Sequence, residues 1–262
     1  MHPILNIAIR AARLTGDLIY KNSENLEITQ PQQQSDHILY MMKKIEKLVM
    51  NIIHKCYPEH VISFKRHSKF EFEIKNHEVQ WIINPLDGIT NFIKKIPHWA
   101  VSIAIIIKKR TEIAVIYDFI RNELFTAVRG QGTKLNGYRM RTSKVRNLNG
   151  MILATDFSFI NNPQYYSQEY LKQMAVIFSK CADCRASGST ALDLAYIASG
   201  RLDGYFKIGF NQLYFSAGEL LIREAGGVVT CFRGCYQMII YNNMIAGNVQ
   251  IVNLILKLLS DE

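Results

Sequence analysis

One short segment of this chain combines residue types that could bind a metal ion and a phosphate group. An apolar run ends at Pro85 and is followed by Leu86, Asp87 and Gly88, which predicts a strand that stops at a turn. The Asp87 carboxylate and the backbone carbonyl of Leu86 are oxygen ligands of the kind that Mg²⁺ prefers. Backbone N–H groups from Gly88 onward could contact phosphate oxygens. Taken alone, the sequence N-P-L-D-G predicts no more than a turn.

Further sequence blocks add weight to the metal-site interpretation. Residues 84–92 resemble the D-P-L/I-D-G-T-x-N-F signature of the inositol monophosphatase family, which supplies metal ligands and phosphate contacts. Other blocks that resemble this family are residues 2–8, 121–126, 188–196 and 213–227. The resemblance covers almost the whole chain. It implies an α+β protein with the layered α/β/α/β/α sugar-phosphatase fold of this family.

Family members hydrolyse phosphate monoesters with Mg²⁺ ions that are held by carboxylates. Within the family, the resemblance is strongest to bacterial members that also serve as Nus factors in ribosomal RNA transcription antitermination. It implies another Nus factor, RNA polymerase and RNA as partners, and a homodimer. It also implies Mg²⁺ as the cofactor, bound weakly or not at all if the ligands are lost.

Most of the implied metal ligands are replaced in this chain. Only Asp87 and the backbone carbonyl of Leu86 match the family pattern. Three positions that carry a carboxylate in the family carry other residues here: Lys65 or Arg66, Asn84 and Tyr214. A unit-charge pair at about 4 Å is worth roughly 4 kcal/mol at an effective dielectric constant near 20, so a lysine ammonium group repels a divalent ion strongly. The alternative is that other carboxylates take over, such as Glu71, Glu73 or Asp193.

The catalytic and substrate-binding positions are altered as well. The threonine that helps to activate the attacking water is Ile89, and its acidic partner aligns with Met42. The glutamate that contacts the inositol ring corresponds to Lys207. The resemblance thus implies that no catalytic residue is intact. Substrate contacts are expected at Gly88, Ile89, Arg185 and Lys207. Lys207 and Arg185, together with Lys65 and Arg66, could make the pocket cationic and able to bind an anion without metal.

Cysteine and histidine residues suggest no other chemistry. The five cysteines are an odd number, which argues against a disulfide framework. Cys181 and Cys184 with Cys231 and Cys235 could supply four thiolates to zinc, but the family resemblance implies no zinc there. All seven histidines lie in the first 98 residues without metal-ligand spacing on a helix, and there is no Gly-x-Ser-x-Gly elbow. Nucleophilic hydrolase chemistry is therefore not expected.

Hydrophobic periodicity places these residues on alternating helices and strands. The expected helices cover residues 4–19, 38–52, 164–180, 190–198, 215–225 and 249–259, and the expected strands cover 79–83, 101–107, 113–117, 124–128, 151–155, 204–206, 228–230 and 244–246. The polar residues 23–35, with Pro31, separate the first two helices. We expect residues 1–262 to form one compact domain of two packed halves, about 1–147 and 148–262.

The composition, with 48% hydrophobic and 20% charged residues, is that of a soluble globular protein. The N-terminal residues do not resemble a signal peptide, and no segment approaches the roughly 20 apolar residues that span a bilayer, so a cytoplasmic location is expected. The formal net charge of +9 favours anionic partners such as RNA. We expect a Nus-factor-like protein that acts in antitermination and ribosome biogenesis without catalysis. The alternative is a Mg²⁺-dependent phosphatase that hydrolyses inositol-1-phosphate or a similar monoester.

Overall fold

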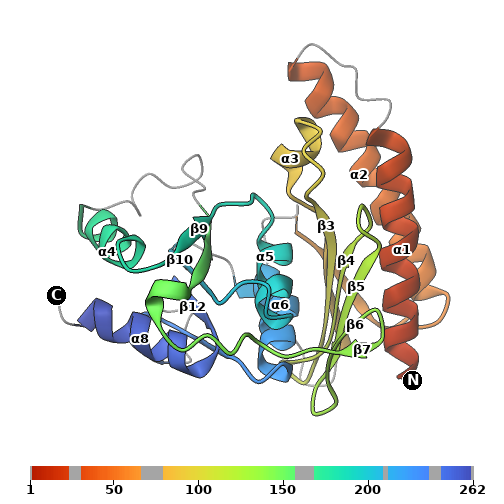
Figure 1. The fold of residues 1–262 in the computed structure, drawn as a ribbon. Helices are drawn as coiled ribbons and strands as arrows, with labels where there is room; N and C mark the ends of the chain where they lie inside the picture. The colour runs from red at the N-terminus through yellow and green to blue at the C-terminus, as the bar shows by residue number, and fades with distance from the viewer. Residues whose placement is uncertain are drawn as a thin grey trace.

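Helices and sheets alternate in the order α/β/α/β/α across the molecule, as Figure 1 shows. The structure is a computed structural model that describes residues 2–23, 31–65, 79–156, 168–208, 212–235 and 243–260. The helices are α1 (Pro3–Ser23), α2 (Pro31–His54), α3 (Ile89–Ile93), α4 (Gln168–Phe178), α5 (Thr190–Ala198), α6 (Gln212–Glu224) and α8 (Val249–Ser260), with a 3₁₀ turn at Leu148–Gly150. This arrangement confirms the fold class expected from the sequence.

The first sheet follows the chain order from β1 to β7. Its strands are β1 (Val61–Phe64), β2 (Val79–Asp87), β3 (Ala100–Ile107), β4 (Arg110–Asp118), β5 (Glu123–Val128), β6 (Gly132–Leu135) and β7 (Tyr138–Arg139). β1 pairs with β2 in parallel, and β2 pairs with β3 in antiparallel fashion. The parallel pairing brings the end of β1 beside the end of β2, where the signature segment lies.

The second sheet has the strand order β11-β12-β10-β8-β9. Its strands are β8 (Ile152–Thr155), β9 (Asp183–Arg185), β10 (Gly204–Ile208), β11 (Val228–Thr230) and β12 (Asn243–Gly247). α5 and α6 lie between the two sheets, α1 and α2 cover the outer face of the first sheet, and α4 and α8 lie on the far side of the second (Figure 1). The two sheets thus draw on residues 61–139 and 152–247. The division into two packed halves of one domain near residue 147 stays a prediction.

β3 shows why the strands of the first sheet read as continuous apolar runs. The pleat points Ile103 and Ile105 toward the core under α1 and α2, and Ala104 and Ile106 toward the core around α5 and α6. Both faces of the sheet are covered by helices, so alternation of apolar and polar residues is not needed. α1 approaches its face closely because the residues that it buries include the small side chains of Ala8, Ala11 and Ala12.

Several boundaries differ from the expectation, and two of them lie at prolines. The strand expected over residues 79–83 continues through Pro85 to Asp87, because a register shift between Asn84 and Asp87 accommodates the missing N–H of Pro85. α2 begins at Pro31 rather than near residue 38, since proline is tolerated in the first turn of a helix. The helix expected over residues 164–180 is α4 within the described residues. None of the described helices is long and apolar enough to cross a membrane.

Gly218 allows α5 and α6 to pack closely between the sheets. A Cβ atom at this position would lie 2.6 Å from Cβ of Leu194 on α5, inside van der Waals contact. We expect Gly218→Ala to lower the free energy of unfolding by about 1–3 kcal/mol, because the overlap outweighs the helix propensity gained. Urea denaturation measures the change. Leu194→Ala removes the Cδ1 atom that would lie 2.4 Å from the added Cβ, so the double variant should lose less than the sum of the two single losses. Additive losses would show that this Cδ1 atom does not clash with the added Cβ.

Candidate functional site

The signature segment ends beside the N-terminus of α5. The carboxylate of Asp87, the last residue of β2, is buried and accepts hydrogen bonds from Ser189 Oγ and from the backbone N of Ala191, both at 2.8 Å. It also accepts a 2.8 Å bond from Nδ2 of Asn84. Ser189 is the N-cap residue of α5, where backbone N–H groups lack helical partners and the helix dipole favours a negative charge. The Asp87 carboxylate therefore stabilises the start of this helix.

Lys65 places a cation next to the same carboxylate. It follows β1, and its backbone N donates to the Ile83 carbonyl at 3.0 Å, which continues the parallel pairing with β2. Its Nζ lies 3.5 Å from Oδ1 of Asp87. The Lys65 side chain is 44% exposed, so this ion pair contributes less than about 1 kcal/mol to stability. An ammonium group thus contacts the one aspartate that matches the family pattern, and Arg66 lies outside the described residues.

Two neighbouring loops are tied together behind this segment. Nδ2 of Asn91, on α3, donates to the carbonyls of His98 and Ser187, both at 2.8 Å. Gly188 has a φ of +83°, a backbone conformation that favours glycine, and a Cβ atom there would lie 3.0 Å from the Asn91 amide and crowd it. Asn91 of the first signature therefore packs directly against Gly188, which precedes Ser189.

Asp193, named above as a possible replacement ligand, is buried in α5. Its Oδ1 accepts a 2.6 Å hydrogen bond from Ser187 Oγ, and its Oδ2 has no partner among the described residues. Burial raises the pKa of the Asp193 carboxyl to about 8, the Ser187 bond opposes that rise, and the charge of Asp87 adds to it. A carboxyl that is protonated near neutral pH is a poor ligand for Mg²⁺.

This raised pKa predicts a pH dependence of stability. Between the ordinary pKa of 3.8 and the folded-state pKa of about 8, the folded protein holds a proton that the unfolded chain has lost, so stability falls as pH rises. From pH 6.5 to 7.5 we expect a loss of about 1 kcal/mol from this group. Urea denaturation of wild type and Asp193→Asn at both pH values isolates it, because other titrating groups are common to both proteins. Equal slopes in the two proteins would contradict the raised pKa.

Among the cations expected to form an anion pocket, the three that the structure describes each contact a carboxylate. The buried Lys207 ammonium pairs with Asp156, which also accepts a 3.3 Å hydrogen bond from Thr190 Oγ1. Arg185, on β9, pairs with Asp183 at 2.5 Å. Together with the Lys65 pair, these contacts reduce the positive charge that an incoming anion would meet. The expectation of a cationic pocket gains no support from the geometry of Lys65, Lys207 and Arg185.

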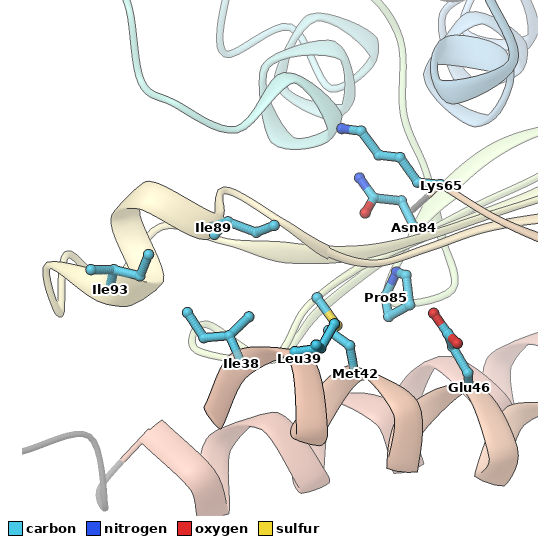
Figure 2. Close-up of a pocket in the computed structure, with 9 residues that line it drawn as sticks. All are labelled: Ile38, Leu39, Met42, Glu46, Lys65, Asn84, Pro85, Ile89 and Ile93. Carbon is cyan, nitrogen blue, oxygen red and sulfur yellow. The ribbon is translucent and has the colours of Figure 1, made fainter. Parts of the chain in front are cut away.

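Ile89 and Gly88 lie at the start of α3. Gly88 has a φ of +94°, and a Cβ there would come within 2.9 Å of the His98 carbonyl oxygen, so only glycine fits. Ile89 and Met42, from α2, both line one pocket (Figure 2). At these two positions the resemblance implies catalytic groups. Leu86 is buried. Of Tyr214, only the helical backbone in α6 is described.

The donor set around Asp87 does not suit a divalent metal ion. The Asp87 oxygens already accept three hydrogen bonds and face an ammonium group. Across the part of the chain that the structure describes, no group of three or more His, Cys, Asp or Glu side chains could hold a metal ion. Glu71 and Glu73 lie outside that part. This finding applies to the zinc alternative as well as to Mg²⁺.

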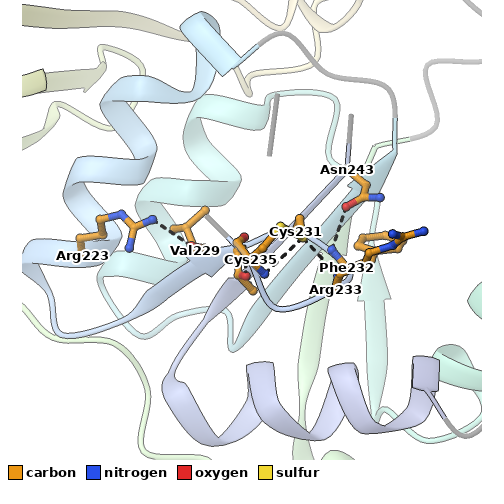
Figure 3. Close-up of a disulfide and its surroundings, with 8 residues drawn as sticks. Arg223, Val229, Cys231, Phe232, Arg233, Cys235 and Asn243 are labelled. Atoms are coloured by element: carbon orange, nitrogen blue, oxygen red, sulfur yellow. Dashed lines mark hydrogen bonds between the residues drawn. A yellow bond between two sulfur atoms is a disulfide. The ribbon is translucent and has the colours of Figure 1, made fainter. Parts of the chain in front are cut away.

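The cysteines correct one expectation. Cys231 and Cys235 form a disulfide across a tight turn, with their Cα atoms 5.3 Å apart, whereas the odd cysteine count argued against a disulfide framework (Figure 3). Cys231 Sγ also accepts hydrogen bonds from the backbone N atoms of Arg233 and Cys235 at 3.2 and 3.3 Å. The count failed because it cannot detect a local pair. Cys181 and Cys184 are free thiols, and burial raises the pKa of Cys184 to about 12.

Ser189 and Asp156 were missed in the sequence. Ser189 carries an N-cap signal, since serine directly before an apolar helical run is favoured there, and this signal could have identified it. Asp156 carries no comparable signal. It follows a strand in the second sheet, and its contact with Lys207 spans 51 residues of sequence.

Comparisons with known proteins identify the family of the chain. The model of the inositol monophosphatase family matches residues 1–261. The chain is 49% identical over 264 residues to Nus factor SuhB of Escherichia coli, covering 100% of this chain and 97% of the relative. It is 44% identical over 259 residues to Nus factor SuhB of Vibrio cholerae, covering 98% and 96%.

Solved structures show the same fold. The extragenic suppressor protein suhB of Bartonella henselae matches with a TM-score of 0.85 at 31% identity, covering 99% of this chain and 100% of that one. Inositol monophosphatase from Anabaena matches with a TM-score of 0.83 at 29% identity, covering 98% and 95%. The chain belongs to the inositol monophosphatase family.

Proposed function

We propose that the protein is a Nus-type factor that acts in ribosomal RNA transcription antitermination and ribosome biogenesis, without catalysis. The observation that carries this proposal is the 49% identity, along the whole chain, to a relative named Nus factor SuhB. The proposed partners are another Nus factor, RNA polymerase and RNA, in the cytoplasm. A homodimer is part of the proposal, and sedimentation velocity of the purified protein tests it.

The absence of catalysis is supported by the contacts at the signature segment. Lys65 presents an ammonium group 3.5 Å from Asp87, at a position where the family has a carboxylate. Ile89 has no hydroxyl group, so it cannot take the part of the family threonine in activating water. A phosphatase of this type needs metal ions to polarise the phosphoryl group and to generate the nucleophile. Lys65 would repel those ions.

RNA contact fits the charge of the chain. The formal net charge is +9, and phosphate contacts made by lysine and arginine give affinity that does not depend on sequence. No RRM or KH signature is present in the sequence, so we do not propose reading of specific bases. Affinity for RNA should therefore fall steeply as salt increases.

A reconstituted transcription assay tests the role. Read-through of a terminator placed behind a ribosomal RNA leader should rise when the protein is added to RNA polymerase and the other Nus factors. The Anabaena inositol monophosphatase, which shares the fold at 29% identity, is the matched control and should give no rise. Pull-down of RNA polymerase and another Nus factor should succeed with this chain and fail with the control. Read-through that is unchanged by the protein would overturn the proposal.

The second candidate is a Mg²⁺-dependent phosphatase that acts on inositol-1-phosphate or a similar monoester. The family model over residues 1–261 and the retained Asp87 favour it. It needs metal ligands that the described residues do not supply. Phosphate release separates the two candidates directly.

A further inference from the structure

A pocket of about 340 Å³ lies between α2 on one side and the end of β2 and α3 on the other (Figure 2). Most of its lining is apolar: Ile38, Leu39, Met42, Pro85, Ile89 and Ile93. Pockets of this volume with largely apolar walls are typical of sites for small molecules. The wall includes Met42 and Ile89, where the family resemblance implies polar catalytic groups. The change to apolar residues alters which ligands this space can accept.

The polar side chains of the lining point in different directions. Figure 2 shows the tips of Lys65 and Asn84 turned away from α2, so that these two residues offer the pocket mainly their aliphatic carbons. Asn84 Nδ2 is bonded to Asp87, and Lys65 Nζ lies beside the same carboxylate. The carboxylate of Glu46, by contrast, extends from α2 toward Pro85 at one end of the pocket. Among the described residues that line the pocket, Glu46 is therefore the one whose charged group extends to this side of β2.

Water contacts apolar side chains at the mouth of the pocket. Ile89 is 44% exposed although it stands on the pocket wall. Covering such surface with an apolar group is favourable in proportion to the area removed from water. A carboxylate can accept several hydrogen bonds, so Glu46 can take one from a ligand in addition to its bonds within the protein.

We propose that this pocket binds a small amphipathic molecule with an alkyl or aryl body and one hydrogen-bond-donating head, such as a hydroxyl or amino group. The body packs against Met42, Ile89 and Ile93, and the head donates to Glu46. This ligand class is distinct from the phosphorylated substrates implied by the family resemblance. The site does not depend on the role in antitermination, and it needs no metal ion.

Methionine methyl NMR tests the site with 1-octanol as the probe. Met42 lines the pocket, while its neighbour Met41 is buried and does not, so the two methyl signals form an internal comparison. With ¹³C-methyl methionine, we expect the Met42 signal, assigned through Met42→Leu, to shift saturably while the Met41 signal stays in place. Octanoate, with the same chain and a head that has no hydrogen to donate, should bind at least about 5-fold more weakly. Inositol-1-phosphate should not shift the Met42 signal.

A pair of isoleucine variants gives the matched control. Ile89→Gln replaces a wall residue, and Ile96→Gln replaces an isoleucine that is 49% exposed outside the pocket. Both are exposed enough for the fold to tolerate glutamine, which the remaining methyl signals verify. We expect Ile89→Gln to weaken binding of 1-octanol about 10-fold and Ile96→Gln to leave it unchanged. Equal affinities in the two variants, equal shifts of Met41 and Met42, or no saturable shift at millimolar 1-octanol would each overturn the proposal.

Discussion

Asp87→Ala is expected to lower the free energy of unfolding by about 3–5 kcal/mol, because it leaves three buried donors without their acceptor. These donors are Nδ2 of Asn84, Oγ of Ser189 and the backbone N of Ala191. Two of them belong to the start of α5, which packs between the sheets, so the loss should affect global unfolding rather than local fraying.

Urea denaturation at constant pH measures this loss, and Lys65→Ala is the control. Lys65 shares the ion pair with Asp87 but is 44% exposed, so its removal should change the free energy of unfolding by less than about 1 kcal/mol. A large loss for Asp87→Ala with a small one for Lys65→Ala would show that the carboxylate now serves the fold. A loss below 1 kcal/mol for Asp87→Ala would mean that its oxygens are not needed by α5 and remain available to a ligand.

Restoring the family residues at four positions is expected to create Mg²⁺ affinity. The variant combines Lys65→Glu, Asn84→Asp, Ile89→Thr and Tyr214→Asp, each of which returns a group that the resemblance implies. Exchanging the ammonium group of Lys65 for a carboxylate changes repulsion into attraction. Because a unit-charge pair at about 4 Å is worth roughly 4 kcal/mol near a protein surface, we expect Mg²⁺ to bind at least about 100-fold more tightly than to wild type.

Isothermal titration with MgCl₂ measures the affinity of the restored variant. Adding Asp87→Asn to the same variant is the control, and it should remove most of the gain, because Asp87 would then be one of the shared ligands. A wild-type protein that already binds Mg²⁺ as tightly as the restored variant would show that Lys65, Asn84 and Tyr214 do not determine metal binding.

The elements with strong periodicity could be predicted from the sequence. α1 and α8 carry apolar stripes at helical spacing, and β3 is an apolar run buried on both faces. The boundaries at Pro31 and Pro85 could not be predicted, because proline usually ends a helix or strand. Here the first turn of α2 accommodates Pro31, and the register shift in β2 accommodates Pro85.

The residues of the site also fall into those that could be predicted from the sequence and those that could not. Asp87, Asn84 and Ile89 stand in a contiguous signature, so their positions were readable from the sequence. The partner of Asp87 across the site, Ser189, lies 102 residues away, and nothing local indicates that the two touch. The pairing of Lys65 with Asp87 and of Lys207 with Asp156 likewise depends on how the strands come together. Contacts of this kind follow from the fold and not from the residue types alone.

Phosphate release from inositol-1-phosphate across a range of Mg²⁺ concentrations tests most directly whether this scaffold has lost its chemistry. The purified wild-type protein is expected to release no phosphate above the rate of the uncatalysed reaction at any Mg²⁺ concentration, because the ammonium group of Lys65 lies beside the one remaining family aspartate. The Anabaena inositol monophosphatase serves as the positive control for the assay. Turnover by wild type that rises with Mg²⁺ and disappears in Asp87→Asn would contradict the account.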